Sequence, residues 1–171
     1  MKTGTPKRSS IIFLQVAIVL IGSGTLAWML WEPHLEGVNA QATLFRIYFK
    51  DPFLAYVYIA SVPFFVALYQ TFKLLGRIGQ NAVFSQRSVS ALRTIKYCAM
   101  ALVILVAGAE AYFLIMQHDQ DDVAGGVAVG LLLMLASVVV ATTAAVLEKL
   151  LQSAIRIKAK RRISSNVENF T

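Results

Sequence analysis

Long apolar stretches separated by short polar segments dominate the sequence. Four of these stretches carry almost no charge. Each reaches the roughly 20 residues that span ~30 Å of hydrocarbon as an α-helix rising ~1.5 Å per residue. The pattern therefore predicts four transmembrane helices, over about residues 11–31, 52–75, 97–117 and 124–147.

Two polar segments next to these spans predict further helical structure. Ser85 is suited to cap a helix in which Val89, Leu92 and Ile95 recur at three-residue spacing. This pattern predicts an amphipathic cytoplasmic helix before the third span. The fourth span is expected to continue past the membrane as a helix through the segment EKLLQSAIRIKAKRR.

Composition places this fold in lipid. Hydrophobic residues make up 57% of the chain and charged residues 15%, against roughly 45–50% and about 25% in soluble domains. The mean hydropathy is +0.65. We therefore predict an all-α membrane protein, a four-transmembrane-helix bundle, with residues 1–160 as one integral membrane domain and 161–171 as a flexible cytoplasmic tail.

The first apolar stretch has an alternative interpretation as a signal peptide. Lys2, Lys7 and Arg8 precede it, and Ala40-Gln41-Ala42 resembles a cleavage site. However, the stretch is longer than the ~7–15 residues of a signal core, and the small residues lie far beyond its end. The pattern favours an uncleaved membrane anchor.

Lysines and arginines gather on one side of the predicted membrane. All but two of the 16 lie before span one, between spans two and three, or after span four; the exceptions are Arg46 and Lys50. By the positive-inside rule both termini are expected to be cytoplasmic. The net charge of +7 is thus mostly a topology signal, and no direct nucleic-acid binding is expected.

Glu110 interrupts the third apolar stretch, at roughly 4.5 Å from mid-membrane. Exposing an ionised acid to lipid there would cost at least ~2.5 kcal/mol, so Glu110 is expected to face the bundle interior. No lysine, arginine or histidine lies at this depth in any span. We therefore expect a protonated, hydrogen-bonded carboxyl.

Residues at the same depth are candidates for an intramembrane polar cluster with Glu110: Ser23, Thr25, Tyr58 and Ser61. Gly130 lies at this level in the fourth span, and small residues let helices approach closely. Two roles for Glu110 stay open. It either holds helices together through hydrogen bonds or takes part in proton relay or ligand recognition.

The segment after the fourth span is a second candidate site because it concentrates cations: Lys149, Arg156, Lys158, Lys160, Arg161 and Arg162. They are suited to anionic lipid, at ~1 kcal/mol per cation, or to a cytoplasmic protein partner. The alternative is ordinary positive-inside anchoring.

Catalytic and metal-binding patterns are missing from the sequence. His34 and His118 fall on the outer side near several carboxylates, but without the close spacing of metal ligands. No histidine base accompanies a serine elbow, and there is no phosphate-binding loop. We expect no enzyme activity, no metal and no cofactor.

Three stretches resemble the bacterial membrane proteins known as domain of unknown function 2975: SVPFFVALYQTFKLL (Ser61 to Leu75), NAVFSQRSVSALRTIKYCAMA (Asn81 to Ala101) and AVLEKLLQSAIRIKAK (Ala145 to Lys160). The likeness runs from span one to about Lys160. It implies a four-helix membrane protein with no established activity and no assigned functional residues. Members of this family are often encoded beside a small helix-turn-helix regulator, which implies a regulatory or sensing role.

Two functions follow as hypotheses. The first is an interaction or sensing protein of the inner membrane, with the lipid bilayer, a cytoplasmic protein and a second copy of the chain as candidate partners. The alternative is a small oligomeric transporter or channel in which Glu110 is the protonatable site.

Overall fold

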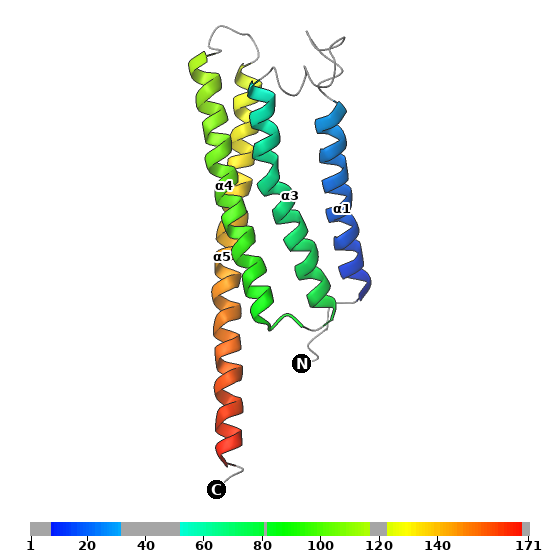
Figure 1. Cartoon of the computed structure of the whole chain (residues 1–171), viewed down its shortest axis with the longest axis vertical. Helices are drawn as coiled ribbons and strands as arrows, with labels where there is room; N and C mark the ends of the chain where they lie inside the picture. The colour runs from blue at the N-terminus through cyan, green and yellow to red at the C-terminus, as the bar shows by residue number, and fades with distance from the viewer. Residues whose placement is uncertain (1–7, 32–51, 81, 117–122, 169–171) are drawn as a thin grey trace.

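The computed structural model describes residues 8–31, 52–80, 82–116 and 123–168, and this part of the chain is helical apart from the short connection before Gln86. Its helices are α1 (Arg8–Trp31), α3 (Pro52–Gly79), α4 (Gln86–Met116) and α5 (Val123–Glu168). Figure 1 shows them side by side, with α5 reaching past the others toward the C-terminus. All four are long and apolar enough to cross a membrane. The all-helical, four-span prediction is confirmed.

The outer faces of the helices are apolar. Leu20 of α1, Ile104 of α4 and Leu132 of α5 are among many large apolar side chains that are mostly exposed. Soluble monomers rarely leave contiguous apolar patches of this kind uncovered. The surface therefore suits contact with lipid chains.

The helices are packed in a row, with the main contacts of the described residues joining α1 to α3, α3 to α4, and α4 to α5. The buried apolar cluster lies where α4 begins and combines Val89 and Leu92 of α4 with Leu151 of α5. Leu74 and Ile155 pack against it. The tightest packing is thus at one end of the bundle, at the base of the α5 extension.

The first turns of α4 coincide with the predicted amphipathic helix. Ser85 stands at the cap position: its carbonyl accepts a hydrogen bond from the Ser88 N–H at 2.9 Å, and the two hydroxyl oxygens are 3.1 Å apart. Val89, Leu92 and Ile95 are all buried. This segment and the third span form one continuous helix, and its cytoplasmic location stays a prediction.

Helix α5 is longer than its predicted span. It continues to Glu168, so residues 161–168 of the predicted flexible tail lie in the helix, and 169–171 lie outside the described residues. Between Lys149 and Glu168 there is no glycine or proline, the residues with the poorest helix propensity. Leu151 and Ile155 also anchor the start of the extension against the cluster near α4.

Candidate functional site

A cavity of about 420 Å³ lies among the four helices. Its lining is mostly apolar and comes from all of them, with Met29 of α1, Phe64 of α3, Val106 of α4 and Leu133 of α5 as examples. This volume falls in the range of roughly 300–1,000 Å³ that is typical of small-molecule sites. A pocket of this kind becomes selective through the few polar groups that face it.

Glu110 is the acidic group in the cavity lining. It lies on α4 with only 9% of its surface exposed, and its carboxyl fills the space left by the missing side chain of Gly130 on α5. A methyl group added at Gly130 would overlap this carboxyl. Glu110 Oε2 is buried and has no hydrogen-bond partner in the described part of the chain. Glu110 thus faces the interior, as expected, but Oε2 lacks the expected hydrogen bond.

The predicted polar cluster is only partly assembled around Glu110. Thr25 of α1 and Ser61 of α3 line the same cavity. Ser23 is exposed and its hydroxyl donates to the Leu20 carbonyl at 3.2 Å. The Tyr58 hydroxyl donates to the carbonyl of Met29, a residue of the lining, at 2.7 Å and so ties α3 to α1, but Tyr58 itself does not line the cavity.

Tyr56 lines the cavity, although it was not among the residues selected for lying at the same depth as Glu110. Its hydroxyl donates to the Leu105 carbonyl of α4 at 2.6 Å. It also lies 2.8 Å from where a side chain at Gly108 would begin. Tyr56 and Tyr58 are two residues apart and so project on different sides of α3. Gly108 was the available sequence signal, because a glycine in a span marks a place where another group comes close.

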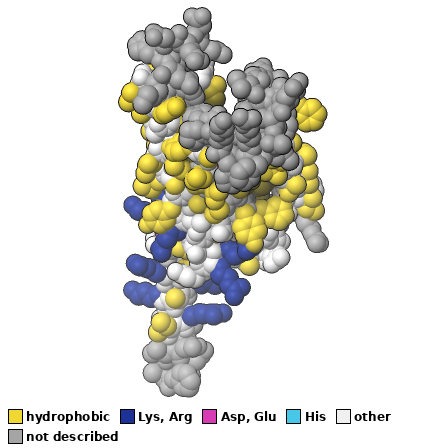
Figure 2. All heavy atoms as spheres, turned by 45° about the horizontal axis from the view of Figure 1, so that its top comes forward, with side chains coloured by type: hydrophobic (Ala, Val, Ile, Leu, Met, Phe, Trp, Pro, Cys, Tyr) yellow, Lys and Arg dark blue, Asp and Glu magenta, His cyan; other side chains and the backbone are white. Residues whose placement is uncertain are grey.

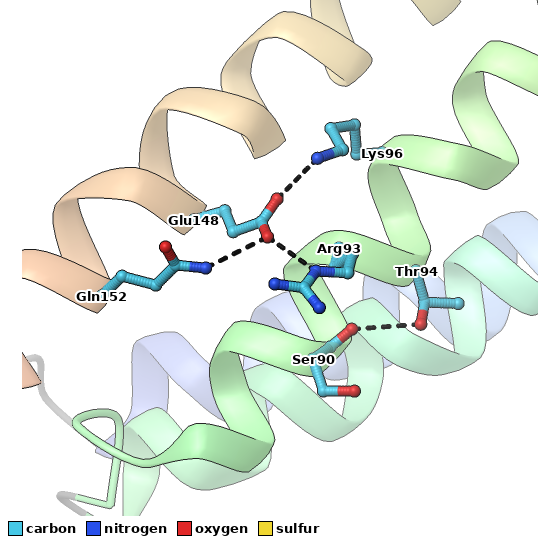
Figure 3. A network of polar contacts seen from close by, with 6 residues as sticks. All are labelled: Ser90, Arg93, Thr94, Lys96, Glu148 and Gln152. Atoms are coloured by element: carbon cyan, nitrogen blue, oxygen red, sulfur yellow. Dashed lines mark hydrogen bonds and ion pairs between the residues drawn. The ribbon is translucent and has the colours of Figure 1, made fainter.

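A buried carboxylate between two cations forms a second polar site, at the base of the α5 extension (Figure 3). Glu148 of α5 lies between Arg93 and Lys96 of α4, with Arg93 Nε 2.8 Å from Oε1 and Lys96 Nζ 2.7 Å from Oε2. Gln152 Nε2 donates to Oε1 at 3.3 Å. The Glu148 side chain is 8% exposed, while that of Arg93 is 53% exposed. The cluster therefore fixes the rotation of α5 relative to α4 at this end.

Sequence reasoning treated Arg93 and Lys96 only as topology charges. A signal for their pairing was present, since they are three residues apart on one helical face. Glu148 is an isolated acid at the start of a cationic segment. An acid in that position calls for a cationic partner, but the sequence does not say which one.

The six cations predicted as a binding segment are all exposed on α5 beyond Glu148: Lys149, Arg156, Lys158, Lys160, Arg161 and Arg162. In Figure 2 the dark blue lysines and arginines gather below the yellow apolar zone, around the narrow lower part of the molecule. Among the described residues no group of three or more histidine, cysteine or acidic side chains is placed to hold a metal ion.

Residues 10–161 match the family model described as "Protein of unknown function (DUF2975)". The chain belongs to this family. No solved structure matches the chain. A similar protein is the "Uncharacterized membrane protein YoaS" of Bacillus subtilis (strain 168), 41% identical over 158 residues that cover 92% of this chain and 98% of the relative.

The DUF2975 assignment confirms the predicted resemblance, and the relative's name together with the four apolar helices supports a multi-pass membrane protein. Neither description states an activity. The features that bear on function are therefore the cavity around Glu110 and helix α5.

Proposed function

We propose that this chain is an interaction protein of the bacterial cytoplasmic membrane, with both termini in the cytoplasm, that senses a condition of the membrane. Helix α5 carries the proposal. Its Gly130 adjoins Glu110 in the cavity, its Glu148 is paired to α4, and its end is an exposed cationic helix. One continuous helix thus joins the cavity that contains Glu110 to a charged surface.

The reach of α5 favours a protein partner over lipid. Lys160, Arg161 and Arg162 follow Glu148 by about 12–14 residues, or ~18–21 Å along a helix. Charges in ~0.15 M salt are screened within ~8 Å. If Glu148 marks the membrane boundary, these distal cations lie beyond the field of anionic headgroups. An acidic protein surface in the cytoplasm is their better complement.

Exposed apolar groups on the same segment support this choice. Ile157 and Ile163 are 57% and 66% exposed among the cations. Protein interfaces combine such apolar contacts with complementary charge, and charge mainly sets the rate and specificity of association. The α5 extension provides both.

Replacing Arg156, Lys158, Lys160, Arg161 and Arg162 together with Gln should remove cytoplasmic partners that copurify with the full-length protein. The expected loss is about tenfold or more, since several charge-assisted contacts disappear together. Quantitative mass spectrometry after mild cross-linking measures it. Higher salt should reproduce the loss for the wild type.

The matched control is Lys149→Gln, which removes one exposed cation at the base of the segment and should leave copurification nearly unchanged. An identical set of partners for the fivefold variant and the wild type would contradict the proposed interaction. Partners that disappear only when anionic lipids are depleted would instead assign these cations to lipid.

A second function, transport, is favoured by one observation: Glu110 is buried with an unpartnered oxygen in a cavity. Intramembrane acids in this setting often carry protons or solutes. In proteoliposomes under a pH gradient, a transporter should move protons or a coupled solute, and Glu110→Gln should abolish this flux. A wild-type protein that moves neither would exclude proton-linked transport.

A further inference from the structure

Most of the hydroxyl groups that line the cavity already donate a hydrogen bond to a backbone carbonyl. Thr25 donates to the Ile21 carbonyl at 2.8 Å and Ser61 to the Tyr58 carbonyl at 2.7 Å. Tyr56 donates across to the Leu105 carbonyl at 2.6 Å. These three hydroxyls therefore offer oxygen lone pairs to the cavity and no free O–H.

Glu110 adds an acceptor of a stronger kind when its carboxyl is ionised, and an amine that enters the cavity as the free base can take up the proton expected on that carboxyl. Its Oε2 is buried without a partner in the described part of the chain, and the residues that the structure describes in the lining include no lysine, arginine or histidine. Among these residues, Ser137 of α5 has the one further hydroxyl. A ligand that brings an anion or a carbonyl would meet lone pairs almost everywhere, whereas a ligand that brings N–H donors would meet complementary groups.

The rest of the lining restricts the ligand's other end. Leu102, Val106, Leu133 and Phe64 are typical of a surface that buries an apolar body. An isolated carboxylate in such surroundings is costly unless a cation pairs with it. Charge and shape thus call for one positive group attached to an apolar body.

We propose that this cavity binds a monocationic amphiphile: a primary or secondary amine that donates N–H hydrogen bonds to the Glu110 carboxylate and places its apolar part among the surrounding side chains. Such molecules concentrate in the bilayer, because their apolar part favours it. The inference goes beyond the proposed function, because the cavity can bind an amine whether or not the α5 extension binds a protein.

Three probes with the same apolar body test the assignment: 1-naphthylmethylamine, 1-naphthylmethanol and 1-naphthoic acid. The full-length protein is placed in nanodiscs of zwitterionic lipid, and binding is followed by naphthyl fluorescence and by melting temperature, with protein-free discs subtracted. The amine is expected to bind about tenfold or more tightly than the alcohol or the acid, as one charge-assisted hydrogen bond supports.

Glu110→Gln should weaken amine binding by about tenfold or more. Ser23→Ala, at the same depth but outside the cavity, should leave it unchanged. Equal affinities for the amine and the alcohol would overturn the proposal, as would absent amine binding by the wild type. The probe series on the wild type decides the question even if Glu110→Gln fails to fold. None of these results depends on copurification through α5, so the two proposals fail separately.

Discussion

Replacing Glu148 with Gln is expected to lower the free energy of unfolding of the purified protein by about 1–3 kcal/mol. The carboxylate is nearly buried and accepts hydrogen bonds from Arg93, Lys96 and Gln152. Glutamine keeps the shape but turns one acceptor oxygen into an N–H₂ donor that faces other donors. Breaking a fully buried pair can cost ~3–5 kcal/mol, and the exposure of Arg93 places this site below that. Denaturant titration in mild detergent measures the change.

A double-mutant cycle with Lys96→Gln isolates the pair. The two single changes should be non-additive by about 0.5–3 kcal/mol, because each removes the same interaction. The control is Lys149→Gln, which alters the charge of the neighbouring exposed residue and should stay within about 0.5 kcal/mol of the wild type. Additive effects in the cycle would mean that the pair contributes nothing to the packing of α5 on α4.

The four helices could be predicted because each apolar stretch is about as long as a helix that crosses a membrane. Apolar stretches of sufficient length have few alternatives to spanning a membrane. Both helical extensions beyond the apolar stretches were also predicted, before span three and over residues 148–162 after span four, and the structure places the start of α4 at Gln86 and the end of α5 at Glu168. Both extensions are polar on one side and are held by Val89, Leu92 and Leu151, whose contact depends on how two distant segments pack.

The sequence predicted how deep in the membrane the site residues lie, but not which side of its helix each residue faces. Counting residues along each span placed Thr25 and Ser61 at the level of Glu110, and both line its cavity. The same count also selected Ser23 and Tyr58, which do not. An α-helix turns by about 100° per residue, so depth leaves the facing side undetermined until the neighbouring helices are known.

Glu148 shows a different limit. Charge counting identifies a segment rich in cations on α5, but it names no partner for the acid at the start of that segment, which pairs with two cations of α4. The partners lie 52 and 55 residues away along the chain. Their meeting follows from the antiparallel packing of α4 on α5, which a local pattern does not encode.

Replacing Gly130 with Val is expected to destabilise the protein by about 2–3 kcal/mol and to displace Glu110. The Glu110 carboxyl occupies the space where a side chain at position 130 would begin. The valine methyl groups therefore force the carboxyl out of its place beside α5 and into the cavity. Unfolding in detergent reports the loss of stability, and the fluorescence titration with 1-naphthylmethylamine reports the altered cavity.

Gly126→Val is the matched control, because it makes the same change one turn earlier on α5 at a position with open space around it. Both variants gain the same helix propensity, so the difference between their free energies of unfolding isolates the collision with Glu110. Gly126 also lines the cavity, so this control applies to unfolding and not to the amine titration. Adding Glu110→Ala should relieve most of the cost at position 130 and none at 126, since only the first site then gains room. Equal stabilities for the two valine variants would mean that Glu110 does not rest against Gly130. The route from the cavity to α5, on which sensing depends, would then lose its first contact.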